Sequence, residues 1–348
     1  MAVGILGTVP RRLVGPALAL VSLLASFLLA EVALGVLGYG TQRLVPQPAG
    51  FWRHDARLGW HHTASSDGVF DRSPVFRTRV RINDKGLRGR DYPYERVAGR
   101  RRILVLGDSF VFGYGVEQEE ALTSVLESLL PATEVINAGV SGYGTDQELL
   151  WFRAEGVRYR PDLVILLMCG NDELDNHSSI AYSLYPKPRF VLSPRGELVL
   201  TNVPVPPPPR RLRLKAWILG HSRVAFQASR LLGRARHAGP ASPRADDGLT
   251  LTLVEALRRE ATANGARFLV AATEKFWSYD DRSARDAHAE LLRALRARGI
   301  PAVDIEGAEG YALEAMTLKG DGHWNARGHE FVARLLEAAI RRDHLLPP

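Results

Sequence analysis

Residues 102–110 read RILVLGDSF, an apolar run that ends in a glycine and polar residues. Four consecutive aliphatic residues are typical of a strand that is buried on both faces of a parallel sheet. Further apolar runs follow at 134–136, 163–168, 267–271 and 302–305, and stretches of helical periodicity separate them. This alternation predicts a doubly wound α/β fold built on five parallel strands.

The composition of the 348-residue chain is that of a protein with a full core, because 46% of its residues are apolar and 24% are charged. A net charge of +7 suits a nucleic acid or an anionic membrane surface. The sequence has no zinc-finger spacing and no RNP-like aromatic stretch, so we expect no nucleic-acid partner.

Cys169 is the single cysteine, which excludes an intrachain disulfide and a cysteine-based metal site. We predict no cofactor and no metal.

The N-terminal region predicts a membrane anchor. Eighteen uncharged, mostly apolar residues run from Leu13 to Ala30 and would cover about 27 Å as a helix, close to the thickness of the hydrocarbon core. A cleaved signal peptide has a shorter apolar stretch, so we expect an uncleaved signal anchor over 1–41. The pair Arg11–Arg12 precedes the stretch, and the next basic residue is Arg43. The positive-inside rule then predicts a single-pass protein of the cytoplasmic membrane whose main domain is periplasmic.

Between the anchor and the first strand, residues 42–101 predict a small β-rich collar. Apolar and polar residues alternate from Phe76 to Ile82, which is typical of a strand with one solvated face. His61 and His62 belong to no partner pattern, and we expect both at the surface.

The main domain, 102–348, is interrupted by an insert at 173–247. Within the insert, a strand–turn–strand pattern at 189–200 predicts a hairpin. A basic amphipathic helix that carries Trp217 is expected over about 211–232. That helix either lies on an anionic membrane surface or is solvated and covers the cleft of the main domain.

Polar motifs follow the predicted strands at the edge of the sheet where doubly wound folds bind ligands. The motifs are Gly107–Phe110, Asn137–Gly142, Gly170–Asp172 and, before the closing helix, Asp321–Asn325. They bring a serine hydroxyl, backbone N–H groups, a side-chain amide and an aspartate–histidine pair to one edge. A serine hydroxyl is a poor nucleophile until a base takes its proton, and a histidine with an ordinary pKa of about 6.5 is suited to that task.

This set of motifs resembles the SGNH/GDSL hydrolase family over about 102–342. The resemblance implies a flavodoxin-like three-layer sandwich in which Ser109 is the nucleophile and His323 is the base. It further implies an oxyanion hole formed by the Ser109 N–H, the Gly142 N–H and the side-chain amide of Asn171.

One spacing departs from the family pattern. The family usually has its aspartate three residues before the histidine, where this chain has Gly320, and the aspartate here is Asp321, two residues before. The pattern Asp-x-His-Trp is similar to that of alginate O-acetyltransferase-like members of the wider superfamily. The resemblance implies that Asp321 orients the imidazole, although some members use a serine–histidine dyad. Structural roles are the alternative, because Ser109 could cap a helix and Gly142 could serve a turn.

The resemblance implies serine esterase chemistry on O-acyl, for example O-acetyl, groups of a glycan or lipid outside the cytoplasm. An O-acyltransferase that modifies cell-envelope polysaccharide would share the acyl-serine intermediate, so the motifs leave hydrolysis and transfer open. A non-catalytic, anchored glycan-binding protein is a further alternative, and the complete set of motifs argues against it. A metal-dependent phosphoesterase is disfavoured because the chain lacks paired histidines near the Gly-Asp and Gly-Asn steps.

Overall fold

The computed structural model describes residues 11–40, 50–182, 185–237, 248–274 and 282–347. The chain forms two compact units. The first unit combines the N-terminal 44 residues with 210–244, and the second combines 45–209 with 245–348. The basic region of the predicted insert therefore belongs to the same unit as the N-terminal helix.

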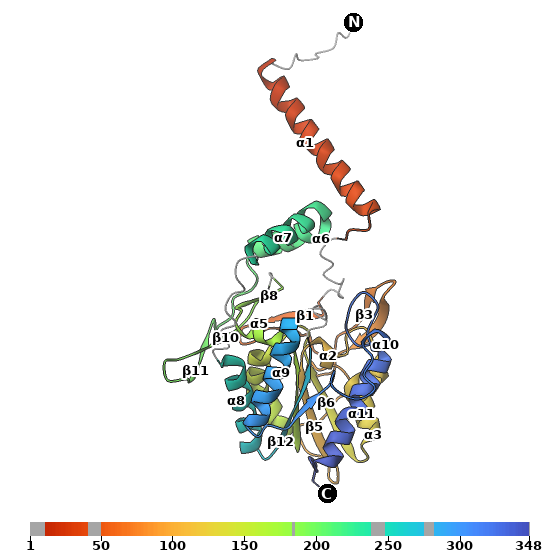
Figure 1. Ribbon diagram of the computed structural model, residues 1–348, viewed down its shortest axis with the longest axis vertical. Helices are drawn as coiled ribbons and strands as arrows, with labels where there is room; N and C mark the ends of the chain where they lie inside the picture. Colours follow the sequence, from red (N-terminus) through yellow and green to blue (C-terminus); the bar gives the residue numbers. More distant parts are fainter. Residues whose placement is uncertain (1–10, 41–49, 183–184, 238–247, 275–281, 348) are drawn as a thin grey trace. The chain divides into compact units, whose positions relative to one another are not determined.

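The second unit is built on a five-stranded parallel sheet (Figure 1). Its strands, in chain order, are β5 (Arg101–Gly107), β6 (Thr133–Gly139), β7 (Leu163–Cys169), β12 (Arg267–Thr273) and β13 (Ala302–Asp304). The spatial order β6-β5-β7-β12-β13 is the 2-1-3-4-5 arrangement of flavodoxin-like sheets, which confirms the predicted fold class. The chain passes to opposite sides of β5 after its first and second strands, and such folds bind ligands at that switch point.

Helices cover both faces of the sheet, so the fold has three layers (Figure 1). The helices on one face are α4 (Thr145–Ala154), α8 (Leu249–Ala263) and α9 (Arg282–Ala297), and those on the other are α3 (Leu122–Leu129) and α11 (Ala326–Arg342). Shorter helical turns complete the unit: α2 (Ser109–Phe112), η1 (Gln118–Glu120), η2 (Gly156–Tyr159) and α10 (Leu313–Met316).

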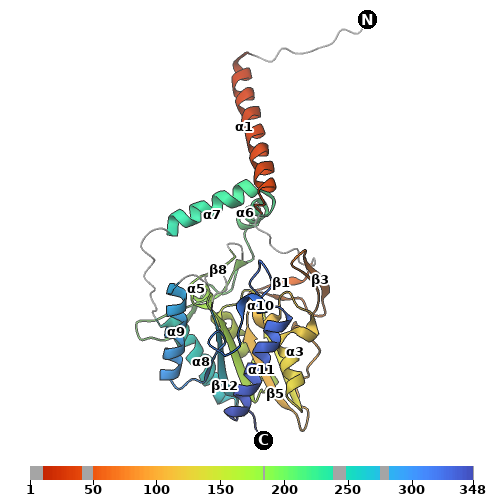
Figure 2. The ribbon, with the colours of Figure 1, turned by 45° about the vertical axis from the view of Figure 1, so that its right-hand side comes forward.

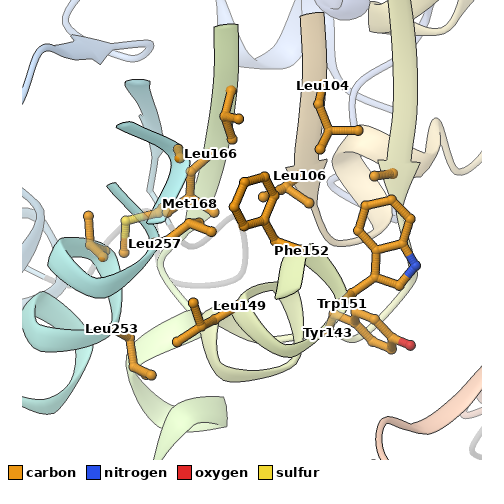
Figure 3. Close-up of a cluster of buried hydrophobic side chains, with 14 of the residues drawn as sticks. Leu104, Leu106, Tyr143, Leu149, Trp151, Phe152, Leu166, Met168, Leu253 and Leu257 are labelled. Atoms are coloured by element: carbon orange, nitrogen blue, oxygen red, sulfur yellow. The ribbon is translucent and has the colours of Figure 1, made fainter. Parts of the chain in front are cut away.

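Each strand contributes to two cores, because successive side chains of a strand point to opposite faces. In β5, Leu104 belongs to the core beneath α4 and α8, and Ile103 belongs to the core beneath α3 and α11. Figure 3 shows the first of these cores, in which Phe152 of α4 projects toward the sheet beside Leu106 and Leu166. Every residue of β6 and β7 is buried, so the loops at their carboxyl ends rest on a packed platform.

Two antiparallel hairpins form the β-rich collar. The first pairs β1 (Trp52–Asp55) with β2 (Gly59–His62), and the second pairs β3 (Asp67–Arg72) with β4 (Phe76–Arg81). Residues of β4 are buried and exposed in turn, as the alternation predicts. The collar shares a third core with the turn after β5, and its buried members are Phe51, Phe70, Phe76, Val80, Ile82, Phe112 and Tyr114.

The expectation that His61 and His62 lie at the surface is wrong, because both are buried in β2. The ring of His62 packs 5.0 Å from that of Phe112, and its Nδ1 lies 3.0 Å from the Gly86 carbonyl oxygen. A polar stretch that looks like a loop is thus enclosed when the collar folds against the main domain. Burial lowers the pKa of His61 to about 4.

The insert begins with small elements beside the sheet. They are α5 (Asp172–Asn176), the pair β8 (Ile180–Ala181) and β9 (Tyr185–Pro186), and the hairpin β10 (Arg189–Leu192) with β11 (Leu198–Thr201). The predicted hairpin is confirmed. Lys187 forms a fully buried ion pair with Asp146 of α4, and its Nζ also donates to the Asp175 carbonyl at 2.9 Å. This lysine ties the insert to the main domain.

The first unit contains α1 (Arg11–Val36), α6 (Arg210–His221) and α7 (Arg223–His237) (Figure 2). Within the described residues, one helix has the length and composition of a membrane span, over Val14–Val36. The basic region forms two helices, so the prediction of one continuous helix there is wrong. The break falls at Ser222, whose hydroxyl accepts the Ala225 N–H at 3.0 Å and caps α7. Gly220, a poor helix former, precedes the break.

Candidate active site

Ser109 opens α2 directly after β5. The preceding residue, Asp108, is the N-cap of this helix, and its carboxylate accepts the Phe110 N–H at 2.9 Å. Because Asp108 satisfies the N-terminus of the helix, the Ser109 hydroxyl takes no part in capping. The fold therefore leaves the Ser109 hydroxyl available, at the switch point of the sheet, for a hydrogen bond to a residue outside this helix.

The loop before α11 brings His323 to Ser109. Ser109 Oγ and His323 Nε2 are 2.8 Å apart, although 214 positions separate the two residues. His323 Nδ1 donates to Asp321 Oδ1, which also accepts the His323 backbone N–H at 3.2 Å. With Nδ1 protonated, Nε2 presents a lone pair to the serine hydroxyl. The structure thus joins Ser109, His323 and Asp321 in one hydrogen-bonded chain.

The short spacing between Asp321 and His323 depends on the backbone between them. Gly322 has a φ of +94°, a conformation that residues with a Cβ rarely adopt. The loop is closed by the Leu318 N–H, which donates to the His323 carbonyl at 2.7 Å. This tight turn folds the carboxylate back onto Nδ1, so an aspartate two residues before the histidine reaches it.

Asp321 has a second partner from the collar. Arg72, the last residue of β3, forms an ion pair with Asp321 Oδ2, while Oδ1 receives His323. The side chains of Arg72 and Asp321 are 27% and 2% exposed, so the pair is largely shielded from water. The rings of Phe110 and Tyr114 lie 5.0 and 4.6 Å from the imidazole. The collar and the turn after β5 together enclose the aspartate–histidine pair.

Gly142 and Asn171 lie beyond β6 and β7, the strands on either side of β5. Gly142 has a φ of +79°, and a Cβ there would meet the ring of Tyr182 at 2.3 Å. Asn171 Nδ2 donates to Asp175 Oδ2 at 2.8 Å. Within the described part of the chain, no hydrogen bond joins either residue to Ser109. The structure thus places both at the same edge of the sheet as the serine without linking them to it.

The family model of GDSL-like lipases and acylhydrolases matches residues 105–331, more than half of the chain. This chain belongs to the GDSL-like lipase/acylhydrolase family. The match begins in β5 and ends in α11, so it contains both Ser109 and His323. The family predicted from the motifs is confirmed. Among curated proteins, no sequence matches the chain.

Several solved structures are similar to this GDSL-family protein, at low sequence identity. A GDSL-like lipase from Bacteroides thetaiotaomicron VPI-5482 is 15% identical, with a TM-score of 0.40 and coverage of 71% of this chain and 91% of that one. The psychrotrophic esterase EstA from Pseudoalteromonas sp. is 16% identical, with a TM-score of 0.42 and coverage of 70% and 98%. A catalytic mutant of Axe2, an acetylxylan esterase from Geobacillus stearothermophilus, is 12% identical, with a TM-score of 0.40 and coverage of 71% and 96%.

Burial dominates the electrostatics of this GDSL-family site. It lowers the pKa of His323 to about 4, while the Asp108 carboxylate opposes that shift and Arg72 adds to it. The imidazole is therefore neutral at pH 7 and able to accept a proton. Burial also raises the pKa of Asp108 and, well above its usual range, that of the Cys169 thiol. Cys169 is a buried, protonated residue of the core.

Two residues beside the GDSL-family motifs have no signal in the sequence. Arg72 is distant from Asp321 along the chain and lies in a stretch with several other arginines, which gives it no distinguishing pattern. Tyr182 belongs to the insert, and only the folded chain brings its ring against Gly142. Both contacts join segments that are distant in the sequence, so only the folded chain reveals them.

Among the described residues, one group of side chains offers atoms of the kind that bind metals, and it joins His288 of α9 to Asp304 and Glu306 at the end of β13. These atoms of His288, Asp304 and Glu306 lie within 4.8 Å of one another. His288 Nε2 is 3.0 Å from Asp304 Oδ1, and Glu306 accepts the Thr273 hydroxyl. These pairings account for the arrangement, and we assign no metal to it.

Proposed function

We propose that this protein cleaves carboxylic esters through an acyl-serine intermediate. The hydrogen-bonded chain from Ser109 Oγ through His323 to Asp321 is the observation that supports the proposal. His323 Nε2 takes the hydroxyl proton while Ser109 Oγ attacks the ester carbon. The imidazolium then gives the proton to the departing alcohol, and a water molecule, deprotonated by the same imidazole, releases the acid. Asp321 keeps the proton on Nδ1 and stabilises the imidazolium.

Three donors are proposed to stabilise the oxyanion: the Ser109 N–H, the Gly142 N–H and the Asn171 amide. Asn171 Nδ2 carries two hydrogens, and Asp175 takes one of them, so the other can face the substrate. Each donor of this kind contributes about 3 kcal/mol to lowering the barrier. The positions of the donors beyond β6, β5 and β7 support this assignment.

The proposed substrate is an O-acylated, for example O-acetylated, glycan or lipid outside the cytoplasm. The chain would consist of an anchor at 1–41, a collar at 42–101 and a hydrolase domain at 102–348 that carries the insert 173–247. The apolar span of α1 supports anchoring in the cytoplasmic membrane. The pair Arg11–Arg12 before the span would keep the N-terminus inside and place the hydrolase domain in the periplasm.

Acyl transfer to a sugar hydroxyl is the second candidate function. The contact between Tyr182 and Gly142 favours it, because a side chain of the insert reaches the edge where the acyl-serine would form. An aromatic ring at that edge can hold an acceptor and restrict water. Adding acceptor sugars to the reaction separates the two functions, since hydrolysis yields free acid and transfer yields an acylated sugar.

Hydrolysis of p-nitrophenyl acetate by the full chain in detergent tests the proposal. Ser109→Ala and His323→Ala should each lower kcat by about 10⁴-fold or more, to background. Ser128→Ala is the matched control, because that exposed hydroxyl donates to the Val125 carbonyl on α3 and should not affect the rate. Equal activity in all variants, together with no labelling of Ser109 by a fluorophosphonate, would overturn the proposal.

A further inference from the structure

Glu31 is a charged residue inside the apolar helix α1, five residues before its end. Its carboxylate accepts the Ser222 hydroxyl and the backbone N–H groups of Arg223 and Val224, the latter two at 2.9 and 3.1 Å. A carboxylate at the start of a helix is favoured by the helix dipole and satisfies N–H groups that lack an intrahelical partner. Three donors from the start of α7 thus stabilise a charge that is costly within a membrane span.

Further contacts hold α7 to the end of α1. Arg223 lies across Gly35, where a Cβ would meet its guanidinium at 3.3 Å. Arg223 Nε donates to the Tyr39 carbonyl at 3.2 Å, and Gln227 Nε2 donates to the Gly40 carbonyl at 3.2 Å. The junction between the two helices is therefore built from specific polar contacts along the last turns of α1.

The length of α1 sets the depth of this junction in a membrane. The stretch from Val14 to Ala30 would cover about 26 Å at 1.5 Å per residue, and a hydrocarbon core is about 30 Å thick. Glu31 and the start of α7 then lie where the hydrocarbon meets the headgroups. Because α6 precedes α7 and packs against it, α6 is held at the same level.

α6 presents an outer face that combines apolar and basic side chains. At 3.6 residues per turn, Leu214, Trp217 and Ile218 share one side of the helix, and they are 58%, 60% and 39% exposed. Leu219, on the opposite side, is buried. Exposed basic residues border the apolar stripe at its start and along both edges: Arg210, Arg211, Arg213 and Lys215.

We propose that this outer face of α6 docks on anionic phospholipid headgroups of the membrane that α1 spans. An apolar stripe bordered by arginine and lysine is the pattern of helices that lie in the membrane interface, with apolar side chains below the headgroups and cations among them. Glu31 fixes α7, and with it α6, at the depth where headgroups lie. The inference rests on the anchoring proposed above and not on the ester chemistry.

Fluorescence quenching in liposomes tests the docking. The full chain with Leu214→Cys, labelled with a fluorophore, is reconstituted in POPC or in POPC with POPG; the native Cys169 is buried. A quencher on the lipid headgroup should reach the label, and more strongly with POPG. Arg211→Gln combined with Arg213→Gln should lower the ratio of docked to undocked helix by more than about tenfold, since each cation near an anionic surface contributes about fivefold.

The matched control removes the same charge from a helix of the second unit, by Arg293→Gln with Arg296→Gln, and should leave the quenching unchanged. Glu31→Gln keeps an acceptor oxygen and should preserve the quenching, whereas Glu31→Ala should reduce it. A label that aqueous iodide quenches equally in both lipid mixtures would overturn the proposal in favour of a solvated helix. A label shielded from both quenchers would overturn it in favour of a protein partner.

Flotation of the same liposomes separates this inference from the proposed function. Protein that does not float with the lipid has no membrane anchor, and this outcome overturns the inference whatever the state of α6. The rate of p-nitrophenyl acetate hydrolysis reports on the ester chemistry independently, because none of the residues altered here is Ser109, His323 or Asp321.

Discussion

Replacing Arg72 with glutamine removes one positive charge from the site and leaves the serine–histidine pair in place. Arg72 faces Oδ2 of Asp321 and His323 faces Oδ1, so the guanidinium and the imidazole lie on either side of one carboxylate. For an assumed separation of about 6 Å and an effective dielectric constant of about 20 to 40, a unit charge changes the free energy of protonating the imidazole by about 1 to 3 kcal/mol. That energy corresponds to about one to two pKa units.

The direction follows from the charge. Loss of the guanidinium favours the imidazolium, so the pKa of His323 should rise from about 4 in the wild type toward about 5 to 6 in Arg72→Gln. Only the neutral imidazole accepts the proton of Ser109. The pH at which kcat/KM falls on the acidic side should therefore rise by the same one to two pH units, about as much as the pKa of His323. Asp321 also loses a partner that orients it, and the plateau of kcat/KM at neutral pH should fall by about tenfold.

The measurement is kcat/KM for p-nitrophenyl acetate across the acidic and neutral range. Arg72→Lys keeps the positive charge, so its acid limb should stay close to that of the wild type. Arg77→Gln is the matched control, because Arg77 on the neighbouring strand is exposed and pairs with Asp71 away from the site. An acid limb of Arg72→Gln that coincides with that of the wild type, or lies at lower pH, would refute the reasoning.

Three more outcomes are expected. Wild-type kcat/KM should be constant through neutral pH and fall to half at pH about 4, where His323 becomes protonated; a midpoint at or above about pH 6.5, the ordinary histidine value, would contradict the burial argument. Gly142→Ala should lower kcat by about tenfold or more and should also lower the melting temperature, because the left-handed backbone and the Tyr182 ring disfavour a Cβ. Lys187→Met should lower the free energy of unfolding by about 3 to 5 kcal/mol in chemical denaturation, since it leaves Asp146 buried without its cation. Adding Asp146→Leu should recover most of that loss, and failure to do so would argue against the ion pair as the cause.

The sheet could be predicted because each strand is a short apolar run that needs no distant information to be recognised. The meeting of Ser109 with His323 at one edge of the sheet could be predicted because each residue lies in a motif next to a strand or helix, as with Ser109 after β5. The ion pair between Arg72 and Asp321 could not be predicted, because an ion pair between distant segments leaves no periodic pattern in the sequence. The hydrogen bond from Asn171 to Asp175 could not be predicted from the sequence either, because it depends on how α5 begins.

Two further differences have a common physical origin in tertiary packing. His61 and His62 look like loop residues, yet the collar encloses them, and the rings around them include Phe112 from the helical turn that carries Ser109. The basic region has helical periodicity throughout, yet it breaks at Ser222 because that residue and its neighbours donate to Glu31 on another helix. In both cases a residue from a distant part of the sequence decides the local structure, and local sequence patterns carry no information about such a contact.

The wide separation along the chain of Ser109, the proposed nucleophile, from His323, its proposed base, has a consequence for the synthesis of the protein. Ser109 and His323 are 214 positions apart, and a ribosome adds about 5 to 20 residues per second, so about 10 to 40 s pass between their syntheses. During that interval the serine has no histidine beside it. An unfinished chain would therefore lack the proposed base, so the proposed ester chemistry would begin only after the loop before α11 has been made and folded.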